Sequence, residues 1–87
     1  MSNFNKLIQI VQKLRAPDGC EWDREQTHES LTPYLLEETY EVLEAIDNKD
    51  FTALKEELGD LLLHVVFQAE LANEKKLFSL EDSIKNV

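Results

Sequence analysis

The stretch "LLEETYEVLEAI", Leu35–Ile46, and its echo nineteen residues later, "LKEELGDLLLH", Leu54–His64, decide how this chain folds. Both stretches place apolar residues at three- and four-residue spacing, which is typical of an amphipathic helix. Both also carry a matched acidic row, which consists of Glu37, Glu38 and Glu41 in the first stretch and Glu56, Glu57 and Asp60 in the second. We therefore expect two neighbouring helices with carboxylates beside their apolar sides.

Four helical segments are predicted, covering residues 4–14, about 32–47, 51 to about 75, and 80–87. Ser30 or Thr32 is the expected N-cap of the second segment and Asp50 that of the third. Ser79, with an acidic residue three positions later, resembles a capping box. Residues 16–30 contain turn-forming residues and read as a connecting loop. The sequence therefore predicts one all-α domain spanning residues 1–87, a helical bundle.

The composition limits the classes of partner. Hydrophobic residues make up 43% of the chain and charged residues 31%, as in ordinary globular domains. The formal net charge of −9 argues against a nucleic-acid partner, because binding to phosphates needs a basic surface. The single cysteine, Cys20, cannot form an internal disulfide, which favours the cytoplasm. The apolar runs are too short to cross a membrane.

The third predicted helix suggests an oligomer. It is apolar nearly all round, and Leu63, Val66 and Phe67 point away from the side expected to face the second helix. One small chain has little material to cover such a helix. We therefore expect the core to be completed by a homodimer or a higher homo-oligomer.

The acidic rows have a definite place on a helical wheel. On either helix, the first carboxylate of the pair (Glu38 or Glu57) lies at the edge of an apolar arc, and the second (Glu41 or Asp60) lies about 60° to the other side. Packing the two apolar arcs together brings all four carboxylates along one seam. Carboxylates that are close together repel one another, and burial raises the cost further. A hard divalent cation such as Mg²⁺ removes this repulsion, so the pattern favours a metal site.

The alternative is that the acidic residues are solvated. Glutamate is a good helix former, and a single acidic row is more often a hydrated surface. Two matched rows joined by a short turn favour the metal site, whereas Glu44, further round the polar side, fits the hydrated surface.

The two acidic motifs, "EETYE" and "ELGD", resemble the signature of the MazG-type, all-α nucleoside triphosphate pyrophosphohydrolases. The preceding segment adds to this resemblance at Cys20, Trp22, Asp23, Gln26, Thr27, His28, Ser30 and Leu31. MazG domains continue into a basic segment rich in Lys, Arg and His, which we expect this chain to lack because it stops at Val87.

The resemblance implies hydrolysis of nucleoside triphosphates to the monophosphate and pyrophosphate with Mg²⁺, or with Mn²⁺ in its place. It implies Glu38, Glu41, Glu57 and Asp60 as metal ligands. A nearby carboxylate (Glu37, Glu41 or Glu56) would take the proton of the attacking water. The expected substrate contacts are Trp22, Asp23, His28 and Arg15.

Several alternatives stay open at this point. Trp22 is either a cap over the core or a platform on which a base stacks. His28 contacts phosphate or base, or helps to start a helix; His64 lies beside the metal or is a hydrogen-bonded core histidine, the more common case. Base selectivity, including a dUTP- or dCTP-type enzyme, is not predicted. The competing function is a catalytically silent helical module for dimerisation or regulation within a larger protein.

Overall fold

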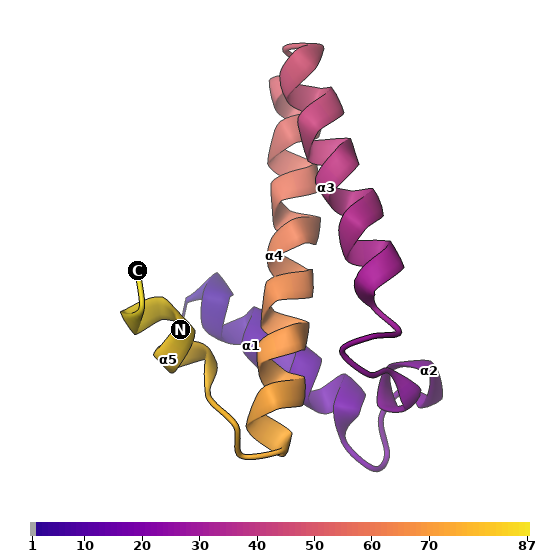
Figure 1. The fold of residues 1–87 in the computed structure, drawn as a ribbon, viewed down its shortest axis with the longest axis vertical. Helices are drawn as coiled ribbons and strands as arrows, with labels where there is room; N and C mark the ends of the chain where they lie inside the picture. Colours follow the sequence, from indigo (N-terminus) through magenta and orange to yellow (C-terminus); the bar gives the residue numbers. More distant parts are fainter. Residues whose placement is uncertain (1) are drawn as a thin grey trace.

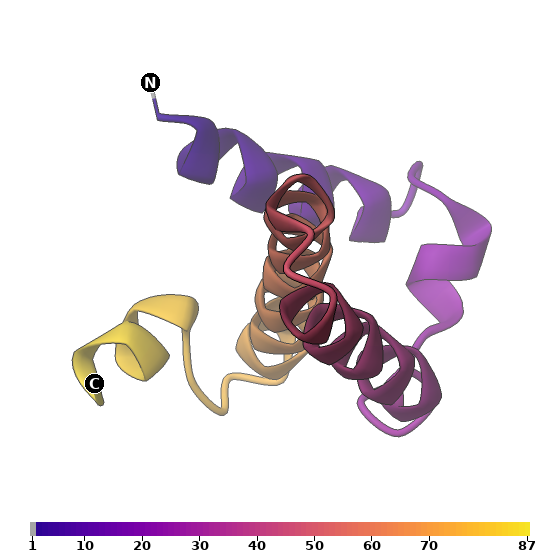
Figure 2. The ribbon, with the colours of Figure 1, turned by 90° about the horizontal axis from the view of Figure 1, so that it is seen from above.

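The computed structural model describes residues 2–87, which form helices joined by short connections (Figure 1). The elements are α1 (Asn3–Arg15), α2 (Glu21–Glu25), α3 (Thr32–Asp47), α4 (Phe51–Glu74) and α5 (Leu80–Lys85). Helix α4 packs against α1, α3 and α5, whereas α2 contacts α1. Figure 2 shows α1, α3 and α5 arranged around α4. The predicted all-α fold is confirmed. Within residues 2–87, no helix has the length and hydropathy needed to cross a membrane.

The ends of α4 and α5 follow the predicted capping chemistry. The side chain of Asp50 accepts a hydrogen bond of 3.0 Å from the Ala53 N–H at the start of α4. At α5, Ser79 and Asp82 each accept a hydrogen bond from the backbone N–H of the other, which completes the capping box. These three bonds satisfy N–H groups that a helix start leaves without partners.

Two local predictions are wrong. The segment predicted as a loop, residues 16–30, contains the short helix α2. The N-cap of α3 is Leu31, with no side-chain hydrogen bond, in place of Ser30 or Thr32. Ser30 instead exchanges hydrogen bonds with Thr27, since each hydroxyl accepts from the other residue's N–H. Leu31 is 2% exposed because its side chain belongs to the hydrophobic core.

The core lies where α1 crosses the C-terminal half of α4. Its buried members are Val11, Leu31, Val66, Phe67 and Leu71, and α1 adds the partly buried Phe4, Leu7 and Ile8. The chain itself therefore covers Val66 and Phe67, and the prediction that a second subunit buries them is wrong. Leu63 remains 37% exposed.

Helices α3 and α4 form an antiparallel hairpin whose tip extends beyond α1 (Figure 1). The radius of gyration is 13.9 Å, compared with about 12 Å for a typical domain of this length. This projecting hairpin accounts for the elongated shape.

The contact between α3 and α4 includes some of the acidic residues. On α3 the buried positions are Glu38, Val42 and Ala45, which lie within roughly 60° of one another on a helical wheel. The apolar arcs that were predicted on α3 and α4 therefore do not pack fully against each other. Six of their residues are exposed by 39–57% and share one side of the hairpin, here named the open apolar face: Leu36, Leu43, Ile46, Leu58, Leu62 and Val65.

Candidate metal centre

Three carboxylates meet between α3 and α4. One carboxylate oxygen from each of Glu38, Glu41 and Glu57 lies within 4.8 Å of the other two. The spacing within α3 places Glu38 and Glu41 almost one turn apart, and the short turn at residues 48–50 brings Glu57 opposite them. The convergence predicted from the two acidic motifs is thus present for these three residues.

Glu38 is the buried member of the group, with 8% of its surface exposed. Its Oε1 is the one buried side-chain oxygen or nitrogen within residues 2–87 that has no hydrogen-bond partner. A buried polar atom without a partner is costly, and a carboxylate more so. This oxygen therefore points to a partner outside the polypeptide chain.

The electrostatics of the cluster are those of crowded acids. Burial, together with the neighbouring Glu41 and Glu57 carboxyls, raises the pKa of Glu38 to about 7. The pKa of Glu57 is also raised, first by desolvation and then by Glu41. Both shifts mean that a proton occupies the group more readily than in an ordinary glutamate. A divalent cation competes with that proton and favours the charged form.

Asp60 lies at the margin of the cluster. Its side chain is exposed and does not join the three close oxygens, yet its negative charge contributes to the raised pKa of Glu38. Glu37 and Glu56, two of the expected proton acceptors, are exposed and stand outside the three-carboxylate group. Among the three candidates for that role, Glu41 alone belongs to the cluster.

Arg15 does not lie beside the carboxylates. Its Nη1 donates hydrogen bonds of 2.8–3.2 Å to the carbonyls of Asp23, Arg24 and Gln26, which close the C-terminal end of α2. Its Nε and Nη2 donate to the Glu74 carboxylate, at the end of α4 and about 25 Å along that helix from Glu57. Arg15 thus fastens α2 to α4, and the structure gives it a positioning role where we expected a substrate contact.

The two histidines are placed differently from one another. The Nδ1 of His28 lies 2.5 Å from Gln68 Oε1, and Gln68 Nε2 donates to the His28 carbonyl at 3.3 Å. His28 therefore ties the start of the α3 segment to α4. His64 is half-buried and makes no hydrogen bond within residues 2–87, so the expected hydrogen-bonded core histidine is wrong. It lines a pocket next to α2.

Trp22 and Asp23, on α2, line the same pocket, together with Tyr34 and Leu63. The sequence analysis did not predict that Tyr34 and Leu63 line a pocket. The available signal was the seven-residue step from Tyr34 to Glu41, which places both on one side of α3.

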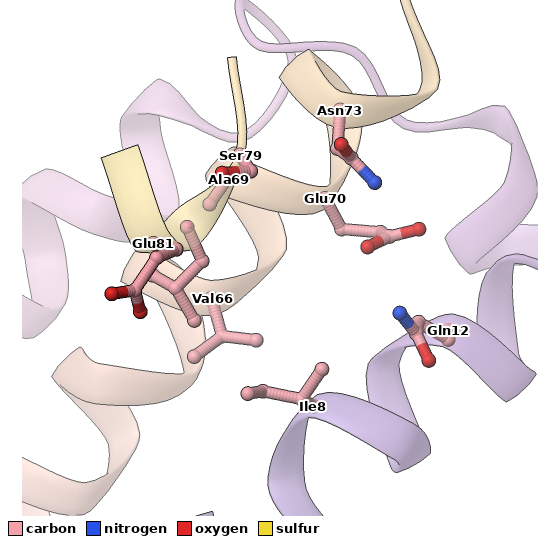
Figure 3. A pocket seen from close by; sticks show the side chains of 9 residues that line it. Ile8, Gln12, Val66, Ala69, Glu70, Asn73, Ser79 and Glu81 are labelled. Atoms are coloured by element: carbon pink, nitrogen blue, oxygen red, sulfur yellow. The ribbon is translucent and has the colours of Figure 1, made fainter. Parts of the chain in front are cut away.

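Another pocket, of about 180 Å³, lies between α1, α4 and α5 (Figure 3). Figure 3 shows Glu70 and Gln12 on the side where α1 faces α4. Burial raises the pKa of Glu70, and the charge of Glu74 adds to this shift. Glu70 lies thirteen residues after Glu57, about 20 Å along α4, so this pocket is separate from the carboxylate cluster.

Comparison with known proteins relates this geometry to a family. Residues 26–87 match the MazG nucleotide pyrophosphohydrolase domain. The nucleoside triphosphate pyrophosphohydrolase/pyrophosphatase MazG of Thermotoga maritima is 58% identical over 84 residues, which cover 97% of this chain and 33% of that protein. The nucleoside triphosphate pyrophosphohydrolase of Escherichia coli K12 is 52% identical over 83 residues, covering 94% and 32%. The uncharacterized protein YabN of Bacillus subtilis is 45% identical over 84 residues, covering 97% and 17%.

The chain spans about a third of the length of the first two relatives. The family match begins just after α2 and covers all of α3, α4 and α5, including the three clustered carboxylates. The resemblance read from the acidic motifs is confirmed, and the chain belongs to the MazG nucleotide pyrophosphohydrolase domain family.

Proposed function

We propose that this chain is a Mg²⁺-dependent domain that hydrolyses nucleoside triphosphates to a nucleoside monophosphate and pyrophosphate. The observation that carries the proposal is the unpartnered Glu38 Oε1, buried within a group of three carboxylates. Two relatives named as nucleoside triphosphate pyrophosphohydrolases support the reaction type.

The carboxylate group fits a hard cation. Its donors are all oxygens, which is the ligand set that Mg²⁺ prefers, with Mn²⁺ as the alternative. Glu38, Glu41 and Glu57 would hold the ion, and Asp60, one turn from Glu57, would complete the set. A bound Mg²⁺ neutralises charge on the phosphates and lowers the pKa of a water molecule. The exposed side of the cluster leaves room for phosphate oxygens and water.

The protein's own contribution is proton transfer and orientation. A carboxylate accepts the proton of the attacking water, whose oxygen adds to phosphorus while the bond between the α and β phosphates breaks. Glu41, Glu37 and Glu56 are the candidates for this base. Trp22, Asp23 and His28 are proposed to contact the substrate. Arg15 acts indirectly, by holding α2 in place.

Assembly and setting belong to the same proposal. We place the domain in the cytoplasm as a homodimer or higher homo-oligomer, acting on a nucleotide without nucleic-acid or membrane partners. The open apolar face supports the oligomer, since monomeric proteins rarely expose large apolar patches. The same face favours the second candidate function, a catalytically silent module for dimerisation or regulation.

Turnover separates the two functions. The chain is incubated with the eight common ribo- and deoxyribonucleoside triphosphates and Mg²⁺, and the products are resolved by chromatography. We expect monophosphate and pyrophosphate from the unaltered chain, a loss of at least roughly a hundredfold in Glu57→Gln, and no change in Asp47→Asn, whose side chain lies on the opposite side of α3 from Glu38. No turnover, or release of a nucleoside diphosphate together with inorganic phosphate, would refute the proposed enzyme.

A further inference from the structure

The pocket of about 180 Å³ between α1, α4 and α5 has no part in the proposed reaction (Figure 3). Three helices that are separate in the sequence supply its walls, so the tertiary fold creates this space. It is distant from the carboxylate cluster, since Glu70 lies about 20 Å along α4 from Glu57. Sites for drug-sized molecules usually measure about 300–1,000 Å³, so this pocket suits a ligand of only a few atoms.

The inner wall of the pocket is apolar. Val66 and Ala69, on α4, are 2% and 5% exposed, and the half-buried Ile8 and Leu80 add apolar surface from α1 and α5. Val66 belongs to the hydrophobic core, and Ile8 and Leu80 pack against that core, so the fold fixes this wall. A short aliphatic stem placed against it would be removed from water, as the stems of lysine side chains are on apolar surfaces.

The charged groups that line the pocket are acidic. Glu70 lies on α4, and Figure 3 shows its side chain extending toward Gln12 of α1. Glu81, in the first turn of α5, lies on the other side of the pocket (Figure 3). No lysine, arginine or histidine of the described residues 2–87 lines this space. The amides of Gln12 and Asn73 add oxygens that can accept hydrogen bonds.

Arg15, whose positive charge reaches Glu70, is already engaged elsewhere. Its guanidinium donates hydrogen bonds to the Glu74 carboxylate and to carbonyls at the C-terminal end of α2. Burial raises the pKa of Glu70 and the charge of Glu74 adds to this rise, which together outweigh the hydrogen bond from Gln12 and the charge of Arg15. A cation supplied from outside the chain would therefore stabilise the charged form of Glu70.

We propose that this pocket binds the alkylammonium group of a small aliphatic amine. The ammonium donates to the Glu70 carboxylate and to the amide oxygens of Gln12 and Asn73, which gives its three N–H groups three acceptors. The hydrocarbon stem lies along Val66 and Leu80. A bare metal ion fits less well, because the wall is apolar and no three ligand atoms of His, Cys, Asp or Glu from residues 2–87 converge here.

Two-dimensional ¹H–¹⁵N NMR of the unaltered chain, without divalent metal, measures this binding residue by residue. The chain is titrated at neutral pH with n-butylammonium chloride, which stays protonated there. We expect saturable shifts at the amide signals of Gln12, Asn73 and Ser79, with a Kd of about 1 mM, which a ligand of so few atoms can reach. The neutral 1-butanol and the anion butyrate should bind at least roughly tenfold more weakly.

Three variants separate the carboxylate from the cavity. Glu70→Gln removes the charge at nearly constant size and should weaken binding at least roughly tenfold. Asp47→Asn removes the same charge at the far end of α3 and should bind like the unaltered chain. Asn73→Phe keeps the carboxylate but fills the opening, and it should also weaken binding at least roughly tenfold, since Asn73 is exposed and the larger ring is tolerated. The dispersed NMR spectrum of each variant verifies that it is folded.

Equal affinity for n-butylammonium and 1-butanol would overturn the proposal, because the cavity would then recognise no charge. Equal affinity in the unaltered chain and Glu70→Gln, or shifts that grow without saturation at exposed acids elsewhere, would overturn it as well. Nα-acetyl-lysine methylamide carries the same ammonium group on a peptide unit. Saturable binding of this compound without binding of n-butylammonium would overturn the assignment to a free amine and point to a lysine side chain of another protein.

Discussion

Glu38 affects both the stability of the fold and the chemistry of the candidate site. It lies on the line along which α3 packs against α4, where an apolar residue would ordinarily be expected, and its Oε1 has no partner within residues 2–87. Its pKa of about 7 follows from burial and from the neighbouring acids. A folded domain tolerates one such residue, but at a cost in stability that a bound cation would remove.

The pH dependence of stability tests this view of Glu38. The folded pKa lies above the ordinary value of 4.5, so between about pH 4.5 and 7 the folded state holds a proton that the unfolded state has released. The stability of the metal-free protein should therefore be highest below this window and fall as the pH rises through it. We expect thermal unfolding to show this fall in the unaltered chain and a clearly smaller one in Glu38→Gln. An identical pH profile for the two proteins would contradict the assignment.

At the scale of secondary structure, the two glycines have opposite roles. A Cβ at Gly19 would collide with the backbone carbonyl oxygens of Lys13 and Leu14, because the chain folds back closely on the end of α1. A Cβ at Gly59, within α4, would meet nothing within 4 Å. The glycine is therefore required at the first position and dispensable at the second.

Alanine at the two positions should change stability in opposite directions. Gly19→Ala should lower the free energy of unfolding by about 1–3 kcal/mol, as expected when an extra methyl group is forced into a closed site. Gly59→Ala should raise it by up to about 1 kcal/mol, since alanine is the better helix former. Denaturant unfolding of both variants measures these changes. A destabilised Gly59→Ala together with a neutral Gly19→Ala would contradict the packing described around both glycines.

Some helices and helix ends were predictable from the sequence alone, and others were not. Helix ends with local chemistry, such as Asp50 and the Ser79 capping box, were predictable because the interacting groups are three residues apart. Helix α2 was not, because a five-residue helix is unstable by itself and here its end is held by Arg15, eight to eleven residues away. Such a contact leaves no periodic pattern in the sequence.

The candidate site was predictable in part for a similar reason. The acidic motifs brought Glu38, Glu41 and Glu57 together as expected. The rotation of α3 and α4 about their own axes, which decides the side that each turns toward the other, was not predicted. The reason is that α4 is apolar nearly all round and its helical wheel has no single buried side. Docking of α1 against Val66 and Phe67 selects one rotation, which turns the open apolar face outward and places Glu57 against α3.

At the scale of the whole molecule, the open apolar face is a group of apolar side chains from two helices that the fold leaves uncovered. Its six residues lie on the side of the hairpin away from Glu41, Asp60 and the pocket lined by Trp22 and Tyr34. A second copy of the chain packed there would bury apolar surface without blocking the site. This differs from the arrangement expected at first, in which the partner covered Val66 and Phe67.

Sedimentation measures the predicted oligomer. The unaltered chain should sediment as a dimer or larger, and Leu62→Glu, in the centre of the face, should shift it toward monomer, because burying an unpaired charge opposes association. Leu77→Glu is the matched control, since Leu77 is 65% exposed and lies outside the face. A monomer at high protein concentration for the unaltered chain would exclude the predicted assembly.

The central claim is that the carboxylates between α3 and α4 hold one divalent cation together, and calorimetric titration with Mg²⁺ at pH 8 tests it most directly. The unaltered chain should bind Mg²⁺ with saturation, Asp47→Asn should bind it equally well, and Glu38→Gln should lose at least roughly tenfold in affinity because a buried oxygen ligand has lost its charge. Equal Mg²⁺ affinity in all three proteins, or no saturable binding in the unaltered chain, would contradict the account.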